Sequence, residues 1–168
     1  MQNNTLILKL AGACMVWAAL SASASFAQGR YQISADGREV EDKRTSLIWG
    51  RCVEGMEWKG RNCQGTVMLV SYPMAAMQAT GAASRSGGGW RLPTLKELVS
   101  IARPAEADIG AGIAAIDAET FPGTPPLRFW TSSVAGPHYY MYVGFKDGEA
   151  GENSRSMLGA LRLVRDKK

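Results

Sequence analysis

The first 27 residues restrict what the chain can fold into, because they separate a segment expected to be removed from the segment that must build a domain. A short polar start ending in Lys9 precedes the apolar run Leu10–Leu20, and small residues fill Ser21–Ala27. This order is typical of a secretory signal peptide cleaved after Ala27 or Ala24. The apolar run is too short to cross a bilayer as a permanent helix. The sequence therefore predicts a signal peptide at 1–27 and an exported chain, 28–168, that does not span the membrane and is periplasmic, secreted or on the cell surface.

The cysteines support export. Cys14 lies in the predicted signal peptide, which leaves Cys52 and Cys63 in the rest of the chain. An even number of cysteines in an exported domain indicates a disulfide. A Cys52–Cys63 bridge closes a short loop and contributes about 3 kcal/mol on the chain-entropy view. The residues from 28 to 168 suffice for one hydrophobic core, so we expect a single domain.

The order of the predicted elements indicates the fold class. Strand composition and turn pairs predict an opening set of strands, and Ser-Tyr-Pro at 71–73 predicts the start of a helix. A second helix is expected after Thr94, and a long Ala-, Gly- and Pro-rich connection fills 103–128. Strands first, then helices, then strands again are typical of an α+β domain, with two helices packed beside a mostly antiparallel sheet and long loops. The predicted strands are 31–33, 39–41, 47–49, 129–131, 139–145 and 160–164.

A central motif joins an extended segment to the second helix. Trp90-Arg91-Leu92-Pro93 is expected to be extended, because a proline disfavours helical backbone in the residue before it. Thr94 and Glu97 have the spacing of a capping box, in which each side chain accepts a hydrogen bond from the other residue's backbone. We therefore interpret Arg91 and Glu97 as a structural ion pair and helix cap.

Several segments, taken in order, match the pattern of one known family. They lie at 40–52, 54–65, 89–98, 121–133, 143–148 and 163–165. Together they resemble the C-terminal domain of collagen-like adhesins, the Lcl C-terminal domain family. The resemblance implies a C-type-lectin-like fold and, as in the best-known members, an adhesin head that binds sulfated glycans. The chain has no collagen-like Gly-x-y region, so the resemblance does not imply a stalked trimer.

Candidate ligand-binding residues gather in the C-terminal third. Sugar rings need aromatic faces, and the arginine fork matches sulfate or carboxylate. We expect Arg128 and Arg155 to bind an anionic group, Trp130 or Tyr140 to offer a sugar face, and Asn153 to bind a hydroxyl. The net charge of +4, or +3 once Lys9 is removed, permits an anionic polysaccharide but is too small for a dedicated nucleic-acid binder.

The sequence gives little support for a cofactor-binding site or a metal site. His138 is the only histidine in the sequence, which disfavours a zinc site. The acidic residues near Asp147 are interpreted as a solvated turn, and calcium dependence is left open. The glycine pattern at 109–115 imitates a dinucleotide fingerprint but follows no predicted strand. We expect no cofactor, no metal and no catalytic residue.

The function predicted from the sequence is an exported, adhesin-like carbohydrate-binding module rather than an enzyme. Two alternatives stay open. The Arg-Leu-Pro-Thr-x-x-Glu core also resembles formylglycine-generating oxidases, although these use reactive cysteines in their C-terminal part and none follows Cys63 here. In the second alternative, the chain is a structural subunit of a pilus or envelope complex and binds a protein partner instead of a glycan.

Overall fold

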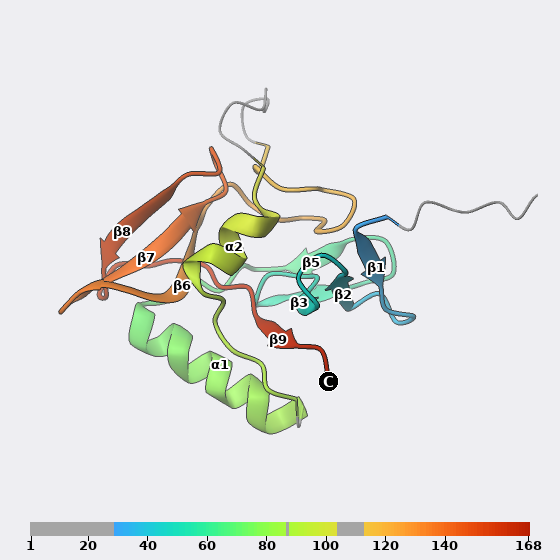
Figure 1. Ribbon diagram of the computed structural model, residues 1–168, viewed down its shortest axis with the longest axis horizontal. Coiled ribbons are helices and arrows are strands. Elements are labelled where there is room, and N and C mark those ends of the chain that lie inside the picture. The colour runs from blue at the N-terminus through green and yellow to red at the C-terminus, as the bar shows by residue number, and fades with distance from the viewer. Residues whose placement is uncertain (1–28, 87, 104–112) are drawn as a thin grey trace, which may run out of the picture.

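Strands pair antiparallel within three sheets, and two helices lie beside them (Figure 1). The computed structural model describes residues 29–86, 88–103 and 113–168, so the predicted signal peptide and residues 109–112 of the fingerprint-like segment lie outside it. The sheet orders are β1-β2-β3-β9, β4-β5 and β6-β7-β8. The helices are α1 (Tyr72–Ser86) and α2 (Leu95–Ile101), and the strands are β1 (Tyr31–Ile33), β2 (Glu39–Asp42), β3 (Leu47–Gly50), β4 (Met56–Trp58), β5 (Cys63–Gly65), β6 (Arg128–Gly136), β7 (Tyr139–Gly144), β8 (Ala150–Ser154) and β9 (Val164–Asp166).

The β2–β3 hairpin forms where the sequence predicts it, and a buried carboxylate fixes its turn. Val40 pairs with Trp49, and both side chains are fully buried. At the turn, Asp42 accepts hydrogen bonds from Arg30 Nε at 3.0 Å and Nη2 at 2.6 Å, and from the Arg44 backbone N–H at 3.0 Å. Arg30 also donates to the Ser100 carbonyl oxygen. The ion pair therefore joins the start of the domain to both the hairpin and α2.

The loop closed by the disulfide is more ordered than its sequence indicates. Cys52 and Cys63 are bonded, as predicted, with their Cα atoms 5.5 Å apart. Strand β4 lies in the loop and pairs with β5, which begins at Cys63 and continues beyond the loop, so that Trp58 lies opposite Cys63. The hairpin has no alternating apolar pattern because only one of its six residues, Cys63, is buried. The covalent bond and the backbone ladder hold these strands, so periodicity does not reveal them.

The central motif has the geometry expected for it. Thr94 caps α2, and its side chain and that of Glu97 form the reciprocal capping box. Arg91 donates from Nη1 and Nη2 to the two Glu97 carboxylate oxygens, at 2.8 and 2.9 Å. Leu92 and Pro93 are buried beside this pair. The predicted ion pair and cap are confirmed. The other helix, α1, begins at Tyr72 as predicted but continues past Gly81 to Ser86.

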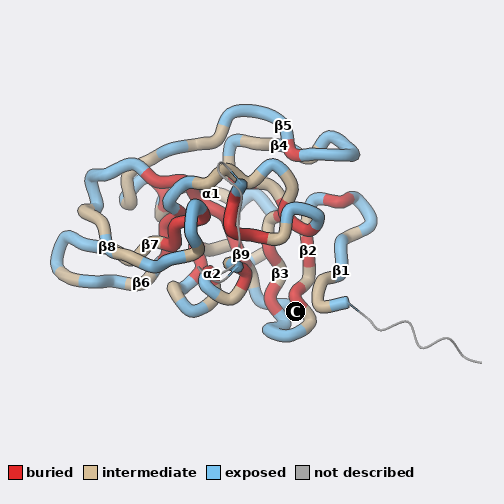
Figure 2. Tube along the Cα trace, turned by 90° about the horizontal axis from the view of Figure 1, so that it is seen from above, coloured by how far each residue is buried: buried red, intermediate tan, exposed pale blue. Residues whose placement is uncertain are grey.

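Strand β6 separates two apolar clusters. Phe129 packs in the larger one with Trp49, Phe121 and Phe145, whereas Trp130 packs in a second one with Ala75 and Leu161. Figure 2 shows the buried segments gathered in the middle of the molecule, between the sheet β6-β7-β8 and strands β2 and β3. Consecutive side chains of a strand point to opposite faces, so a strand buried on both sides has no polar face.

The C-terminal segment contains a buried cation. The predicted strand at 160–164 is displaced. Residues 160–163 are buried, but of these only Ala160 makes an isolated bridge, to Phe129, and β9 covers Val164–Asp166. Arg162, fully buried, donates to the backbone oxygens of Gly50 and Arg51 and to Thr124 Oγ1. Burial lowers the pKa of Arg162 to about 9, so it stays charged at neutral pH. Its guanidinium therefore fastens the C-terminal segment to the end of β3.

The architecture confirms the α+β class, with antiparallel pairing that is divided among three sheets instead of one. Within the described ranges, none of the helices has both the length and the apolar character required to span a membrane.

We predict that the disulfide sets a large part of the stability. Replacing both cysteines, Cys52→Ala with Cys63→Ala, should lower the free energy of unfolding by about 3 kcal/mol in urea denaturation, because the unfolded chain regains the freedom of the open loop. Reductant should lower the stability of the native protein to the same value and leave the double variant unchanged. A native protein indifferent to reductant would contradict this.

We also predict that acid lowers the stability of the fold because two carboxylates become protonated. Burial alone would raise the pKa values of Asp42 and Glu97, but hydrogen bonds from Arg30 and Arg44 to the first, and from Arg91 and Thr94 to the second, hold both below their usual values. A carboxyl with a lowered folded-state pKa stabilises the fold above its unfolded pKa, and this contribution is lost as pH falls through the folded value. Urea denaturation should show stability falling below about pH 4.

The Glu97→Gln variant tests this assignment. It should be less stable at neutral pH and lose less stability on acidification than the native protein. Glu119→Gln serves as the matched control, because Glu119 is exposed and its carboxylate has no hydrogen-bond partner among the described residues. Parallel stability–pH curves for the native protein and Glu97→Gln would refute the proposed origin of the acid sensitivity.

Candidate functional site

Trp130, one of the two residues expected to offer a sugar face, lies in the core. Its side chain is 1 % exposed, and its indole N–H donates to the Val70 carbonyl oxygen at 2.9 Å. The Tyr72 ring meets it edge-on, with ring centroids 5.8 Å apart. Gly159 leaves room for the indole, since a Cβ there would lie 2.8 Å from Nε1. A ring enclosed in this way presents no face to a ligand. The prediction that Trp130 offers a face to a sugar is therefore wrong.

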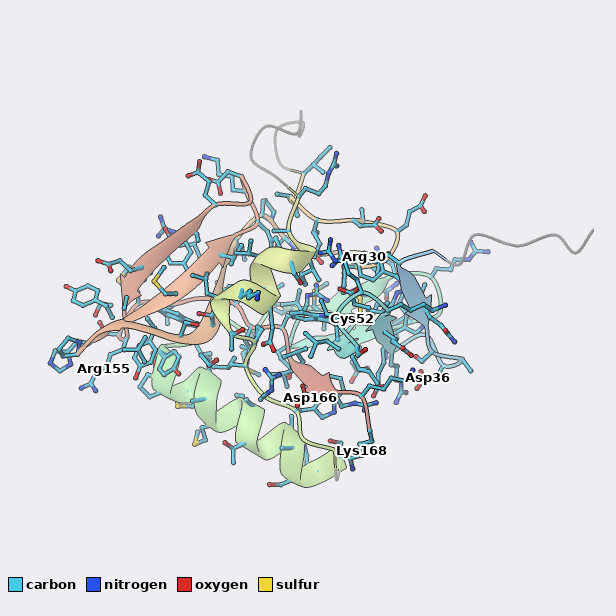
Figure 3. All side chains as sticks on the ribbon, viewed as in Figure 1. Arg30, Asp36, Cys52, Arg155, Asp166 and Lys168 are labelled. Atoms are coloured by element: carbon cyan, nitrogen blue, oxygen red, sulfur yellow. A yellow bond between two sulfur atoms is a disulfide. The ribbon has the colours of Figure 1, made fainter. Side chains whose placement is uncertain are left out.

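The other predicted residues divide into two groups. Tyr140 and Asn153 are direct partners on β7 and β8, and Arg155 follows β8. The Arg155 carbonyl oxygen accepts from the Tyr72 backbone N–H, which brings this group to the start of α1. Tyr140 stacks on Tyr72 with the ring planes 15° apart, so one face of Tyr140 is covered. Figure 3 shows Arg155 at the outer tip of the sheet, on the side of the molecule away from Cys52.

Arg128 lies at the opposite end of the same sheet. It pairs with Gly144, four residues along β7 from Tyr140, which corresponds to about 13 Å of extended strand. Its guanidinium lies over the Tyr142 ring, 5.1 Å from the ring centroid. The Tyr142 ring itself lies across β8 at Gly151, where a Cβ would be 2.6 Å from the tyrosine hydroxyl. The glycine therefore lets the ring lie flat across the strand, and the ring holds Arg128 by a cation–π contact.

A cavity of about 450 Å³ opens beside this pair, and we call it the Arg128 cavity. Its volume is within the range of about 300–1,000 Å³ typical of small-ligand sites. Apolar side chains line one part, and charged residues of the β7–β8 turn line the rest. The lining residues are Leu69, Pro126, Leu127, Arg128, Tyr142, Gly144, Lys146, Asp147, Glu149, Ala150, Leu158 and Gly159.

The charges in this cavity are balanced in sign but not paired with one another. Arg128 and Lys146 supply two cations, and Asp147 and Glu149 two carboxylates, yet none of the four forms an ion pair with a described residue. Asp147 Oδ1 accepts from the Glu149 backbone N–H, which fixes the turn. Free donors and acceptors therefore surround a partly apolar hollow, an arrangement suited to a ligand with hydroxyls and an anionic group.

Metal binding has no cluster to support it in the described ranges. There, no three His, Cys, Asp or Glu side chains come together in a way that could hold an ion. The acidic stretch singled out in the sequence forms the β7–β8 turn and part of β8, with Asp147, Glu149 and Glu152 exposed.

The sequence points to Arg128 and to the acidic turn at Asp147, but not to the apolar walls of the cavity. Leu69 and Leu158 contribute apolar walls that are 45 % and 62 % exposed, and they lie 89 positions apart in the chain. They are brought together because Val70 and Gly159 pair in an isolated bridge. Exposed leucines have no periodic signal, so the sequence does not point to them.

Comparison with known proteins places the chain in a family. No curated protein and no solved structure matches it, so the C-type-lectin-like form implied by the sequence resemblance stays a prediction. One family model, described as the Lcl C-terminal domain, matches residues 38–165. The match includes the hairpin, the disulfide loop, the capped helix, the cavity and the C-terminal segment, and the chain therefore belongs to the Lcl C-terminal domain family.

Proposed function

We propose that the protein is an exported, adhesin-like module that binds an anionic glycan, sulfated or uronic, in the Arg128 cavity. The observation that carries the proposal is Arg128 itself: an exposed guanidinium held over Tyr142, with no carboxylate partner among the described residues, at a hollow of ligand size. Family membership supports an adhesin-like role. The disulfide supports export, because such bonds persist in oxidising compartments.

The geometry suggests how a glycan would be held. Arg128 would donate two N–H groups to a sulfate or carboxylate, and Lys146 would add a second cation. The exposed part of Tyr142 and the leucines would contact the apolar face of a sugar ring, while Asp147 and Glu149 would accept hydrogen bonds from hydroxyls. Since these carboxylates repel a dense polyanion, we expect a glycan with spaced anionic groups. Arg155, at the far end of the sheet, would contact a longer chain.

A glycan array followed by titration tests the proposal. We predict binding to a sulfated or uronic oligosaccharide whose affinity falls as salt rises from about 50 to about 500 mM, because exposed charges are screened over shorter distances. Arg128→Ala should weaken binding at least about tenfold, as expected for loss of a charged hydrogen bond. Arg155→Ala should weaken the binding of longer oligosaccharides only.

Arg61→Ala is the matched control, because Arg61 is exposed on the disulfide loop and makes no hydrogen bond or ion pair with the described residues. It should change affinity little. A blank array, or a ligand indifferent to salt and to Arg128→Ala, would refute the proposed site. A blank array together with a stable co-purifying protein would support the structural-subunit alternative instead.

We further propose that the protein is not an oxidase of the formylglycine-generating type. Cys52 and Cys63 are bonded to each other, and no cysteine follows them to react. Incubation with copper and a cysteine-containing peptide should give neither oxygen consumption nor peptide oxidation, as followed with an oxygen electrode and by mass spectrometry. Turnover with stoichiometric copper would overturn the binding-module proposal.

A further inference from the structure

A second set of hollows lies around the end of β3 and shares no lining residue with the Arg128 cavity. One hollow, about 320 Å³, is lined by Arg38, Arg51, Trp58 and Lys59 among others, and a second, about 290 Å³, by Ala82, Arg85 and Trp90 among others. Gly50 and Glu54 line both. The two hollows therefore adjoin at Glu54, and we call them together the Glu54 groove.

Half-buried Glu54 accepts no hydrogen bond at its carboxylate from a described residue. Its backbone is fixed, because its N–H donates to the Leu161 carbonyl oxygen and its own carbonyl oxygen accepts from the Met68 N–H. Its side chain makes no hydrogen bond and no ion pair with a described residue. Burial raises its pKa, and the nearby charges of Arg85 and Arg162 oppose that rise only in part. Because the Glu54 side chain is only partly buried, its carboxylate oxygens are open to the groove and can accept hydrogen bonds from a ligand that brings donors.

A tryptophan lies in the hollow on each side of this carboxylate, held by an arginine. The Arg51 guanidinium lies over the Trp58 ring at 4.1 Å from the centroid, and that of Arg165 over Trp90 at 5.3 Å. Trp58 also packs against Gly37, where a Cβ would lie 2.4 Å from the indole nitrogen. Each arginine covers part of its ring, so a sugar would pack on the part left open. Rings fixed in this way lose little conformational entropy on binding. They suit the C–H faces of successive sugar rings.

The charges of the groove decide what kind of sugar fits. Arg38 and Arg85 are cations in the two hollows, and they would repel an ammonium group. Glu54 would repel a sulfate or carboxylate, and Glu57 is already paired with Lys59 at 2.6 Å. A neutral ligand with vicinal hydroxyls meets neither penalty, because two hydroxyls can donate to the two oxygens of one carboxylate and accept from a neighbouring arginine.

We propose that the Glu54 groove is a second ligand site, which binds a neutral oligosaccharide with Trp58 and Trp90 beneath sugar rings and Glu54 accepting hydrogen bonds from their hydroxyls. Each hollow is about the smallest size typical of a ligand pocket, so the ligand is an extended segment with sugars on both sides of Glu54. The site is independent of the anionic-glycan site at Arg128.

Calorimetric titration of the full protein with neutral hexasaccharides tests the proposal; suitable probes are cellohexaose, maltohexaose and the hexamer of N-acetylglucosamine. At least one should bind, and the affinity should be unchanged between low and high salt, in contrast to an anionic glycan. Glu54→Gln keeps the size of the side chain and should weaken binding at least about tenfold, as expected for loss of hydrogen bonds to a charged group. Arg61→Ala, outside the groove, should leave binding unchanged.

A second variant protects the test from misfolding. Ser86→Leu adds a larger side chain to the hollow that contains Trp90, from an exposed position on α1 where leucine is a good helix former, and it should block binding without lowering the melting temperature. If none of the hexasaccharides binds, or if Glu54→Gln and Ser86→Leu both bind normally, the proposal is wrong. It is also wrong if Arg128→Ala abolishes binding while Glu54→Gln does not, because the sugar then occupies the other cavity.

Discussion

The burial of one cation, Arg162, is the constraint on which the arrangement of the domain depends. A guanidinium removed from water must find acceptors, and Arg162 finds them on the end of β3 and on Thr124, while its plane lies over the Phe121 ring at 4.8 Å. Its Nε has no partner among the described residues. Removing the acceptors would leave a charge in the core, at a cost of several kcal/mol. The C-terminal segment, the end of β3 and the 120–124 turn therefore stay together, and Glu54 lies close enough to oppose the fall in the Arg162 pKa.

The parts of the fold that the sequence predicts are those with a local physical cause. The β2–β3 hairpin has apolar residues on one face, and Thr94 and Glu97 have capping-box spacing. The two cysteines outside the predicted signal peptide have few alternatives to each other. Strands β4, β5 and β8 were not predicted, because they are short and mostly exposed and are held by pairing rather than burial. Residues 160–163 look like a strand because Leu161 and Leu163 alternate with Arg162, but Ala160 belongs to one apolar cluster and the two leucines to the other, and the segment does not pair in a ladder.

The candidate sites were less predictable because they are assembled from distant segments. Arg128 follows from the chemistry of anion binding, but the burial of Trp130 follows from α1 covering that face of β6, which no local pattern reports. Trp58 and Trp90 are thirty-two positions apart, and their hollows meet where Gly50 and Glu54 line both. In the sequence Glu54 is an ordinary loop glutamate. Only the folded structure shows that no described residue donates a hydrogen bond to the Glu54 carboxylate.

The position of β8 at one edge of the sheet β6-β7-β8 has a consequence for how the protein behaves at high concentration. An edge strand offers unpaired backbone groups to any other chain that can add a strand, and a long apolar edge invites aggregation. β8 is only five residues long, with a glycine at position 151 and the exposed charge of Glu152. Glycine lowers strand propensity and a charged side chain opposes stacking of identical copies, so the edge discourages self-association. The domain can thus keep an open sheet edge at high concentration without pairing with further copies of itself.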